Sequence, residues 1–335
     1  MEQQSKPIKV LSTLDMTGYS VEGVEAGFQR FDVSTFSKFI SSLYQLVRKS
    51  RDYDAIMFTS GTALTLLAIM MVKLLRPSNK IYIFDLILKR PRSRKEKIIA
   101  FIKRFFLKFV DCFMMINKSW SGYSYYYGVG EDKCIYIPFK ANNYKIHNNF
   151  KIRNNGYALC CGASQRDIDT LVKAGRLTDT EIKILLPKHM ESAHNTRFTA
   201  NDIPSNVTII REFLKRDDWY RYMAESFCVV IPIIEDTLQP AGISVYLEAM
   251  MFRKPVVITK GSSTEGILDD NVQAIMVPPN DPRAIVSALS RLSNDQQFYD
   301  ELAENGYRYA SSLQDHSRMV CDILKSFRKP EVVFT

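Results

Sequence analysis

The fold is decided by the stretch from Pro240 to Asp281, PAGISVYLEAMMFRKPVVITKGSSTEGILDDNVQAIMVPPND. An apolar segment before it, Cys228 to Ile233, predicts a buried strand that ends in a polar loop. Gly242, Ile243 and Ser244 then open a predicted helix, whose free N–H groups and positive dipole end attract anions. Because Gly242 has no side chain, a phosphate can approach this corner closely.

The residues after this corner fit the remainder of a nucleotide diphosphate. Glu248 lies further along the predicted helix, where its carboxylate can accept hydrogen bonds from ribose hydroxyls. A second predicted strand, 255–259, leads into the small-residue turn 260–263, and a closing strand covers 273–277. This order of elements is what an enzyme needs to hold a nucleotide diphosphate.

The same block resembles the C-terminal signature of retaining GT-B glycosyltransferases of group 1, which transfer a sugar from a nucleotide-sugar to an acceptor. LEAMMFRKPVVIT and STEGILDDNVQAIMVPPND carry the resemblance. The family has two glutamates separated by seven residues, and Pro240 stands where the first is expected. The side chain of Gln239 or Glu235, or the amides of Ala241 and Gly242, remain as replacements. The alternative is a Rossmann-like half domain that binds another ligand.

Composition predicts a two-domain protein of ordinary make-up. The chain has 335 residues and 46% hydrophobic content, enough for two cores. The six cysteines lie mostly inside apolar runs without paired ligand spacing, which predicts reduced core residues of a cytoplasmic protein. The N-terminal sequence has no apolar signal-peptide core, and the longest apolar stretch, Thr62 to Val72, is too short to span a bilayer. We expect that stretch to form a buried helix.

The positive charge is concentrated in the segment from Lys89 to Lys108. Nine basic residues face one acid there, a net of +8 in a chain of net +9. Large apolar residues recur at three- and four-residue spacing through the same segment, which is typical of a helix on an anionic membrane. The predicted membrane-binding residues are Lys89, Arg90, Arg92, Arg94, Lys95, Lys97, Phe101, Phe105 and Phe106. Core packing of the apolar face is the main alternative. Nucleic acid is not expected as a partner, because no stacking platform or groove-reading motif accompanies the charge.

Alternation of apolar strands and helices along the chain predicts an α/β fold with parallel sheets. The predicted strands are 8–14, 54–59, 80–84, 112–117 and 134–138, then 157–161, 181–187, 207–210, 228–233, 255–259 and 273–277. The asparagine-rich run 141–156 is the best linker. The resemblance implies two Rossmann-like domains that face each other across a cleft. These are an acceptor-binding domain at 1–145, a nucleotide-sugar-binding domain at 146–309 and a C-terminal helix, 310–335, that returns to the first domain.

The resemblance also implies the rest of the donor site. LCCGASQRDIDTLVKA is similar to the element in which a basic residue neutralises the donor diphosphate, with Gly162 ending a strand and Arg166 as the cation. Enzymes of this type use fixed cations and helix ends, so neither a metal nor a cofactor is expected. Arg211, Lys173 and Lys260 are reserve cations. The alternative for Arg166 is a surface arginine paired with Asp169 or Asp167.

Candidate acceptor residues follow strands of the first half. Asp15, Thr17 and Gly18 follow the first strand, and Lys118 follows a later one. Small polar loops of this kind are also common turns. Asp85 ends the strand KIYIF and is predicted to line the sugar or acceptor site, although a strand-terminal aspartate is also a good helix cap. We therefore take Asp85, Arg166 and Glu248 as the candidate catalytic residues. The candidate donor-binding residues are Gly162, Arg166, Gln239, Ala241, Gly242, Ile243, Ser244, Glu248 and Arg211.

The resemblance implies a metal-independent glycosyltransferase of the hexosyltransferase type that retains anomeric configuration. We expect a nucleotide-sugar donor and a lipid-linked or oligosaccharide acceptor, in the synthesis of a cell-surface polysaccharide. The expected location is the cytoplasmic face of the cell membrane. Two alternatives remain, a nucleotide-sugar epimerase on the same fold and a non-catalytic membrane or nucleic-acid adaptor on a degenerate one.

Overall fold

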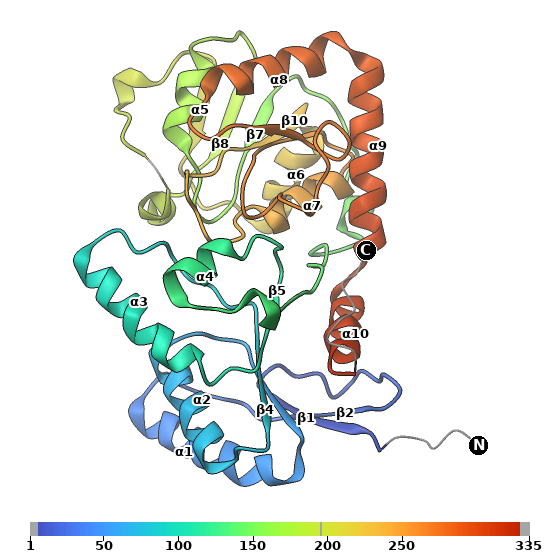
Figure 1. Cartoon of the computed structure of the whole chain (residues 1–335). Helices are drawn as coiled ribbons and strands as arrows, with labels where there is room; N and C mark the ends of the chain where they lie inside the picture. Colours follow the sequence, from blue (N-terminus) through green and yellow to red (C-terminus); the bar gives the residue numbers. More distant parts are fainter. Residues whose placement is uncertain (1–5, 195, 329–335) are drawn as a thin grey trace. The chain divides into compact units, whose positions relative to one another are not determined.

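The computed structural model describes residues 6–194 and 196–328 (Figure 1). These residues divide into two compact units, the first ending at Pro138 and resuming at Ser317, the second covering Phe139 to His316. The boundaries predicted from the sequence lie after residues 145 and 309. The end of the predicted C-terminal segment, residues 329–335, lies outside the described residues.

The first unit contains a six-stranded parallel sheet in the order β2-β1-β3-β4-β5-β6. Its strands are β1 Ile8–Ser12, β2 Val24–Phe28, β3 Ala55–Phe58, β4 Lys80–Phe84, β5 Cys112–Met115 and β6 Cys134–Tyr136. The sequence predicted all of these except β2. That strand, VEAGF, contains glutamate and glycine, both poor strand formers, and lies at the sheet edge.

Four helices cover one face of this sheet: α1 Phe36–Lys49, α2 Ala63–Leu75, α3 Arg94–Leu107 and α4 Ser121–Tyr127 (Figure 1). Every crossover from β2 to β6 moves in the same direction, and right-handed crossovers then place all four helices on the same side. Helix α10, His316–Ser326, leads to Phe327, whose ring lies 4.6 Å from that of Tyr82 on β4. The segment that follows α9 therefore packs on the first sheet.

The second unit contains a six-stranded parallel sheet in the order β12-β11-β10-β7-β8-β9. Its strands, all of them predicted, are β7 Ala158–Cys160, β8 Ile182–Leu185, β9 Val207–Ile210, β10 Cys228–Ile231, β11 Val256–Thr259 and β12 Ile275–Val277. Its helices are α5 Ile168–Gly175, α6 Arg216–Glu225, α7 Ile243–Met251, α8 Pro282–Asn294 and α9 Gln296–Leu313. Short 3₁₀ helices lie at Ser50–Asp52, Glu131–Lys133, Ile146–Asn149, Lys188–Ala193 and Ala200–Asp202. The predicted α/β class with two parallel sheets is confirmed.

Strand order shows where each unit can bind a ligand. The chain direction across the sheet reverses between β1 and β3 in the first unit, and between β7 and β10 in the second. In open parallel sheets, ligands bind beyond the carboxyl ends of the strands at such reversals. The relevant loops are those after β1 and β3, and those after β7 and β10.

Candidate active site

The corner after β10 has the geometry of an anion site. Gly242, the N-cap of α7, has φ of 97°, and no side chain caps the helix. The first described helical bond runs from the Tyr246 amide to the Gly242 carbonyl, at 2.9 Å, so the N–H groups of Ile243 and Ser244 precede the helical ladder. A Cβ atom at Gly242 would lie 3.0 Å from the Ile231 side chain. Glycine is therefore required here by both conformation and space.

The neighbouring residues limit what can replace the missing first glutamate. The Ala241 amide donates to the Gln239 carbonyl at 2.7 Å, so the prediction that this amide is a free donor is wrong. The Ser262 hydroxyl donates to the same carbonyl at 2.9 Å. Glu235 is exposed and accepts a bond from Asn280 at 2.6 Å. The side chain of Gln239 and the amide of Gly242 remain as candidate replacements.

Arg166 lies buried beneath the loop that follows β7, with 2% exposure. Its Nε donates to the Cys161 carbonyl at 3.0 Å and its Nη1 donates to the Ser164 carbonyl at 2.8 Å. Gly162 has φ of 118°, and a Cβ there would come within 2.2 Å of Nη2 of Arg166. Gly162 thus makes room for the guanidinium under the loop.

The alternative of a surface arginine paired with Asp167 or Asp169 is wrong. Asp167 caps α5 by accepting from the Thr170 amide at 3.2 Å. Asp169 accepts from the Arg197 amide at 2.7 Å. The guanidinium is therefore a buried cation that has no acidic partner among the described residues and donates to backbone carbonyls.

Backbone bonds connect the loops after β7 and β10. The Asp167 amide donates to the Pro232 carbonyl at 3.0 Å, and the Ile234 amide donates to the Gln165 carbonyl at 3.0 Å. The Arg166 amide donates to Nδ1 of His194 at 3.1 Å. Burial and the nearby guanidinium lower the pKa of His194 to about 4, so this imidazole is neutral. Sequence reasoning missed His194, because no motif marks it.

Glu248 is buried on α7, with 7% exposure. The Tyr220 hydroxyl donates to its Oε1 at 3.4 Å. Burial raises the pKa of Glu248 to about 7, while Tyr220, Arg216 and Lys140 act in the opposite direction. A carboxylate poised near neutrality, next to two cations, is typical of a binding or catalytic site. Tyr220, Arg216 and Lys140 were not predicted, because Lys140 and helix α6, which carries the other two, are both far from Glu248 in sequence.

The reserve cation Arg211 is already paired. It follows β9 and forms an ion pair with Glu191, and both side chains remain partly exposed. A bound diphosphate would have to compete with this pair.

Candidate acceptor residues of the first unit lie at one sheet edge. Both the amide and the hydroxyl of Thr17 donate to Oδ1 of Asp15, at 3.1 and 2.7 Å, which forms a tight turn after β1. Gly18 faces open space. Nζ of Lys118 lies 4.9 Å from the ring centroid of Tyr136. These residues follow β1 and β5, and Asp85 follows β4, so parallel pairing brings all of them to the carboxyl edge.

Asp85 has an unusual backbone. Its φ is 53°, a left-handed value that is uncommon for non-glycine residues. Its amide donates to the Met114 carbonyl at 2.9 Å, and burial raises the pKa of its carboxyl. The helix-cap alternative is wrong, because Ser93 caps the next helix, α3. A strained, half-buried acid at a strand end is typical of a functional residue.

Helix α3 has its apolar side chains on the outside. Phe101 is 75% exposed and Phe105 is 53% exposed, as are Ile98 at 62% and Ile102 at 51%. By contrast, Lys103 is half-buried and has a lowered pKa because of that burial. Core packing therefore does not explain the apolar face, except at Phe106, which is half-buried. The six predicted basic residues lie in or just before this helix, and five of them are exposed while Arg90 is half-buried.

The chain resembles several known proteins. A family model described as "Glycosyl transferases group 1" matches residues 197–309. The O-antigen chain mannosyltransferase C of Escherichia coli is 22% identical over 227 residues, which cover 65% of this chain and 60% of that protein. The chain thus matches less than two thirds of that relative's length.

Solved structures share the fold across most of the chain. Anabaena HepE in complex with UDP-glucose aligns with a TM-score of 0.64 and 14% identity, covering 96% of this chain and 100% of HepE. A sucrose-phosphate synthase from Thermosynechococcus elongatus aligns with a TM-score of 0.62 and 14% identity, covering 93% of this chain and 84% of that one.

Proposed function

We propose that the chain is a glycosyltransferase of the group 1 type with the GT-B fold, and that it transfers a sugar from a nucleoside diphosphate donor to a saccharide acceptor. The single observation that carries this proposal is the uncapped start of α7 at Gly242, with the buried Arg166 on the adjoining loop and Glu248 further along the same helix. HepE binds UDP-glucose, and the E. coli relative is an O-antigen mannosyltransferase. The first supports a donor of this class, and the second supports a role in polysaccharide synthesis.

We propose that the reaction retains the configuration of the sugar, as the resemblance of the Gly242 block to retaining enzymes implies. The N–H groups of Ile243 and Ser244 and the charge of Arg166 stabilise the diphosphate as its bond to the sugar C1 breaks. The acceptor oxygen then bonds to C1 on the same face, and its proton passes to the departing diphosphate oxygen. We infer that these fixed charges let the reaction proceed without a metal. Asp85 would bind a hydroxyl of the sugar or acceptor.

The first test is nucleotide binding and transfer. We expect nucleoside diphosphates to raise the melting temperature of the protein, and Glu248→Ala to abolish the rise. Transfer of radiolabel from a nucleotide-sugar into a lipid or saccharide fraction would distinguish a transferase from an epimerase, which leaves the label in the nucleotide-sugar. If millimolar nucleoside diphosphates have no effect on the wild-type protein, the proposal fails.

We further propose that the protein works at the cytoplasmic face of an anionic membrane, on a lipid-linked acceptor. The outward apolar face of α3 supports this, together with the basic residues around it. Helix α1 adds a stripe of Phe36, Ile40 and Tyr44, which are 69%, 47% and 67% exposed. Helix α2 lies between α1 and α3 and contacts both. Among the described residues, no helix is long and apolar enough to cross a bilayer, so attachment would be through this surface.

A further inference from the structure

His194 lies on a segment that packs beside the loop of Arg166. The 3₁₀ helix Lys188–Ala193 follows β8, and His194 is its C-cap. Because β8 pairs with β7 in parallel, this segment and residues 161–167 (the Arg166 loop) start from the same edge of the second sheet. The two are joined by a bond from the Gln165 amide to the Ala193 carbonyl at 2.8 Å. The proposed reaction uses Arg166, whereas His194 has no role in it.

Three consecutive amides of the Arg166 loop, those of residues 165–167, are held by fixed acceptors. The two outer amides donate to backbone carbonyls of neighbouring segments, at 2.8 and 3.0 Å. The middle one, the amide of Arg166, donates instead to a side chain, Nδ1 of His194, at 3.1 Å. Gln165 has a left-handed φ of 58°, which is unfavourable for a residue with a side chain. The imidazole therefore helps to hold a strained loop in one conformation.

The same bond fixes the protonation of the imidazole. Since Nδ1 of His194 accepts a hydrogen bond, it carries no proton, and the ring proton is on Nε2. Nε2 is buried and has no hydrogen-bond partner within the part of the chain that the structure describes. The imidazole is thus uncharged, and a proton on Nδ1 would break its bond to the Arg166 loop.

An acceptor without charge matters at this place because Arg166 is a buried cation. Its guanidinium donates to the carbonyls of Cys161 and Ser164, which carry no net charge. The guanidinium and burial both lower the pKa of His194 to about 4, so the two side chains are close enough to interact electrostatically. A carboxylate at this place could accept the same amide bond, but its negative charge would offset that of the guanidinium. An imidazole gives the loop its bond and leaves the charge uncompensated.

We propose that His194 is a positioning residue for sugar transfer, which holds the Arg166 loop through an uncharged acceptor and so preserves the positive charge of Arg166 for the donor diphosphate. The inference rests on the proposed function, since it takes the diphosphate to bind near this loop. It makes charge at position 194 more important than shape. A neutral acceptor of similar size should replace the imidazole, and an acid of the same size should not.

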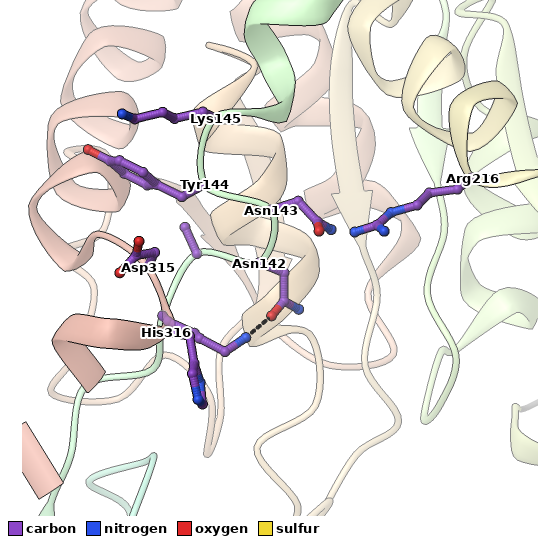
Figure 2. Close-up of a pocket in the computed structure, with 9 residues that line it drawn as sticks. Asn142, Asn143, Tyr144, Lys145, Arg216, Asp315 and His316 are labelled. Atoms are coloured by element: carbon purple, nitrogen blue, oxygen red, sulfur yellow. Dashed lines mark hydrogen bonds between the residues drawn. The ribbon is translucent and has the colours of Figure 1, made fainter. Parts of the chain in front are cut away.

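The test compares His194→Asn with His194→Asp. Both side chains offer an oxygen where Nδ1 accepts, but the aspartate is kept ionised by the nearby guanidinium. The control is the same pair of substitutions at His316, which is also half-buried in the second unit. Figure 2 shows His316 in the lining of a cavity that includes no residue of the Arg166 loop.

Binding of UDP, GDP, ADP and inorganic pyrophosphate is measured by calorimetry on the full chain at neutral pH. We expect His194→Asn to bind the preferred nucleoside diphosphate within about twofold of wild type. His194→Asp should weaken both that ligand and pyrophosphate about tenfold or more, because the added charge acts on the diphosphate that the two share. Both His316 variants should bind like wild type.

Other outcomes separate this inference from the proposed function. If wild type binds a nucleoside diphosphate and His194→Asp binds it equally well, or if the Asn and Asp variants lose the same affinity, only the inference is overturned. If wild type binds no nucleoside diphosphate, both proposals fail. Should the Asp variant not fold, His194→Ala takes its place. It should speed hydrogen exchange of amides 165–167 and weaken pyrophosphate binding relative to His194→Asn, and unchanged exchange and binding would overturn the inference.

Discussion

Replacing the buried acid Glu248 by glutamine is expected to stabilise the protein above neutral pH while it weakens donor binding. In the folded protein, burial raises the pKa of this carboxyl from 4.5 to about 7. Between these two values the folded state holds a proton that the unfolded state has lost. The free energy of unfolding therefore falls as pH rises through this window, and the loss is complete above pH 7.

The magnitude follows from the size of the shift. The rise of the pKa from 4.5 to about 7 corresponds to about 3 kcal/mol, because each tenfold change in an equilibrium constant is worth about 1.4 kcal/mol. Glutamine has the shape of the neutral acid and has no charge to desolvate. Glu248→Gln should thus be more stable than wild type by about 3 kcal/mol at pH 8, but by only about 1 kcal/mol at pH 5.

The assay is denaturation of the full chain at pH 5 and pH 8, for wild type, Glu248→Gln and the control Glu265→Gln. Glu265 is exposed, so its substitution should have no pH-dependent effect. The reasoning is refuted if Glu248→Gln gains no stability at pH 8, or gains the same amount at both pH values. A stabilised variant with weakened nucleotide binding would show that burial of this acid serves function at the expense of stability.

Three further predictions test other parts of the protein. Gly242→Ala should lose about 1 to 3 kcal/mol of stability and most diphosphate binding, because φ there is 97°. The control Gly261→Ala, where the glycine faces open space, should change neither property. Denaturation measures the stability and calorimetry measures the binding. Asp85→Asn should keep or raise the melting temperature, since asparagine tolerates a positive φ and has no charge to bury, but it should lower kcat at least a hundredfold. Unchanged kcat would contradict a role in transfer. Phe101→Ser should weaken binding to phosphatidylglycerol vesicles about tenfold in a sedimentation assay. Phe213 is similarly exposed but lies in the second unit, so Phe213→Ser should not weaken it. Equal effects of the two substitutions would count against an α3 membrane surface.

The sequence predicted the strands well because buried parallel strands consist of continuous apolar runs. Strand β2, Val24–Phe28, was not predicted, because it is an edge strand that pairs on one side only and exposes Glu25. The corner at Gly242 was also predictable from local sequence. A glycine between a predicted strand and a predicted helix indicates a turn with a backbone conformation that other residues rarely adopt. Local patterns do not show which way a helix faces, and α3 places Lys103 inward and Phe101 outward.

The unpredicted part of the site depends on contacts between distant segments. Tyr220, Asn143 and Glu248 form one chain of hydrogen bonds although they are far apart in sequence. The burial of Arg166 was also missed, because a polar turn suggests exposure. It becomes possible only through the space that Gly162 leaves. Such arrangements need the tertiary structure, since no residue spacing encodes them.

The candidate residues share one physical property that separates them from ordinary core residues. Glu248 is an acid in a site that favours its neutral form, Arg166 is a buried cation without a described acidic partner, and Asp85 has a left-handed backbone. Each of these features opposes folding stability, and a protein selected for stability alone would lose them. A bound donor would supply what the first two lack: ribose hydroxyls for the acid and a diphosphate for the cation. The unfavourable environments of Glu248 and Arg166 in the free protein therefore match two parts of the ligand that it is expected to bind.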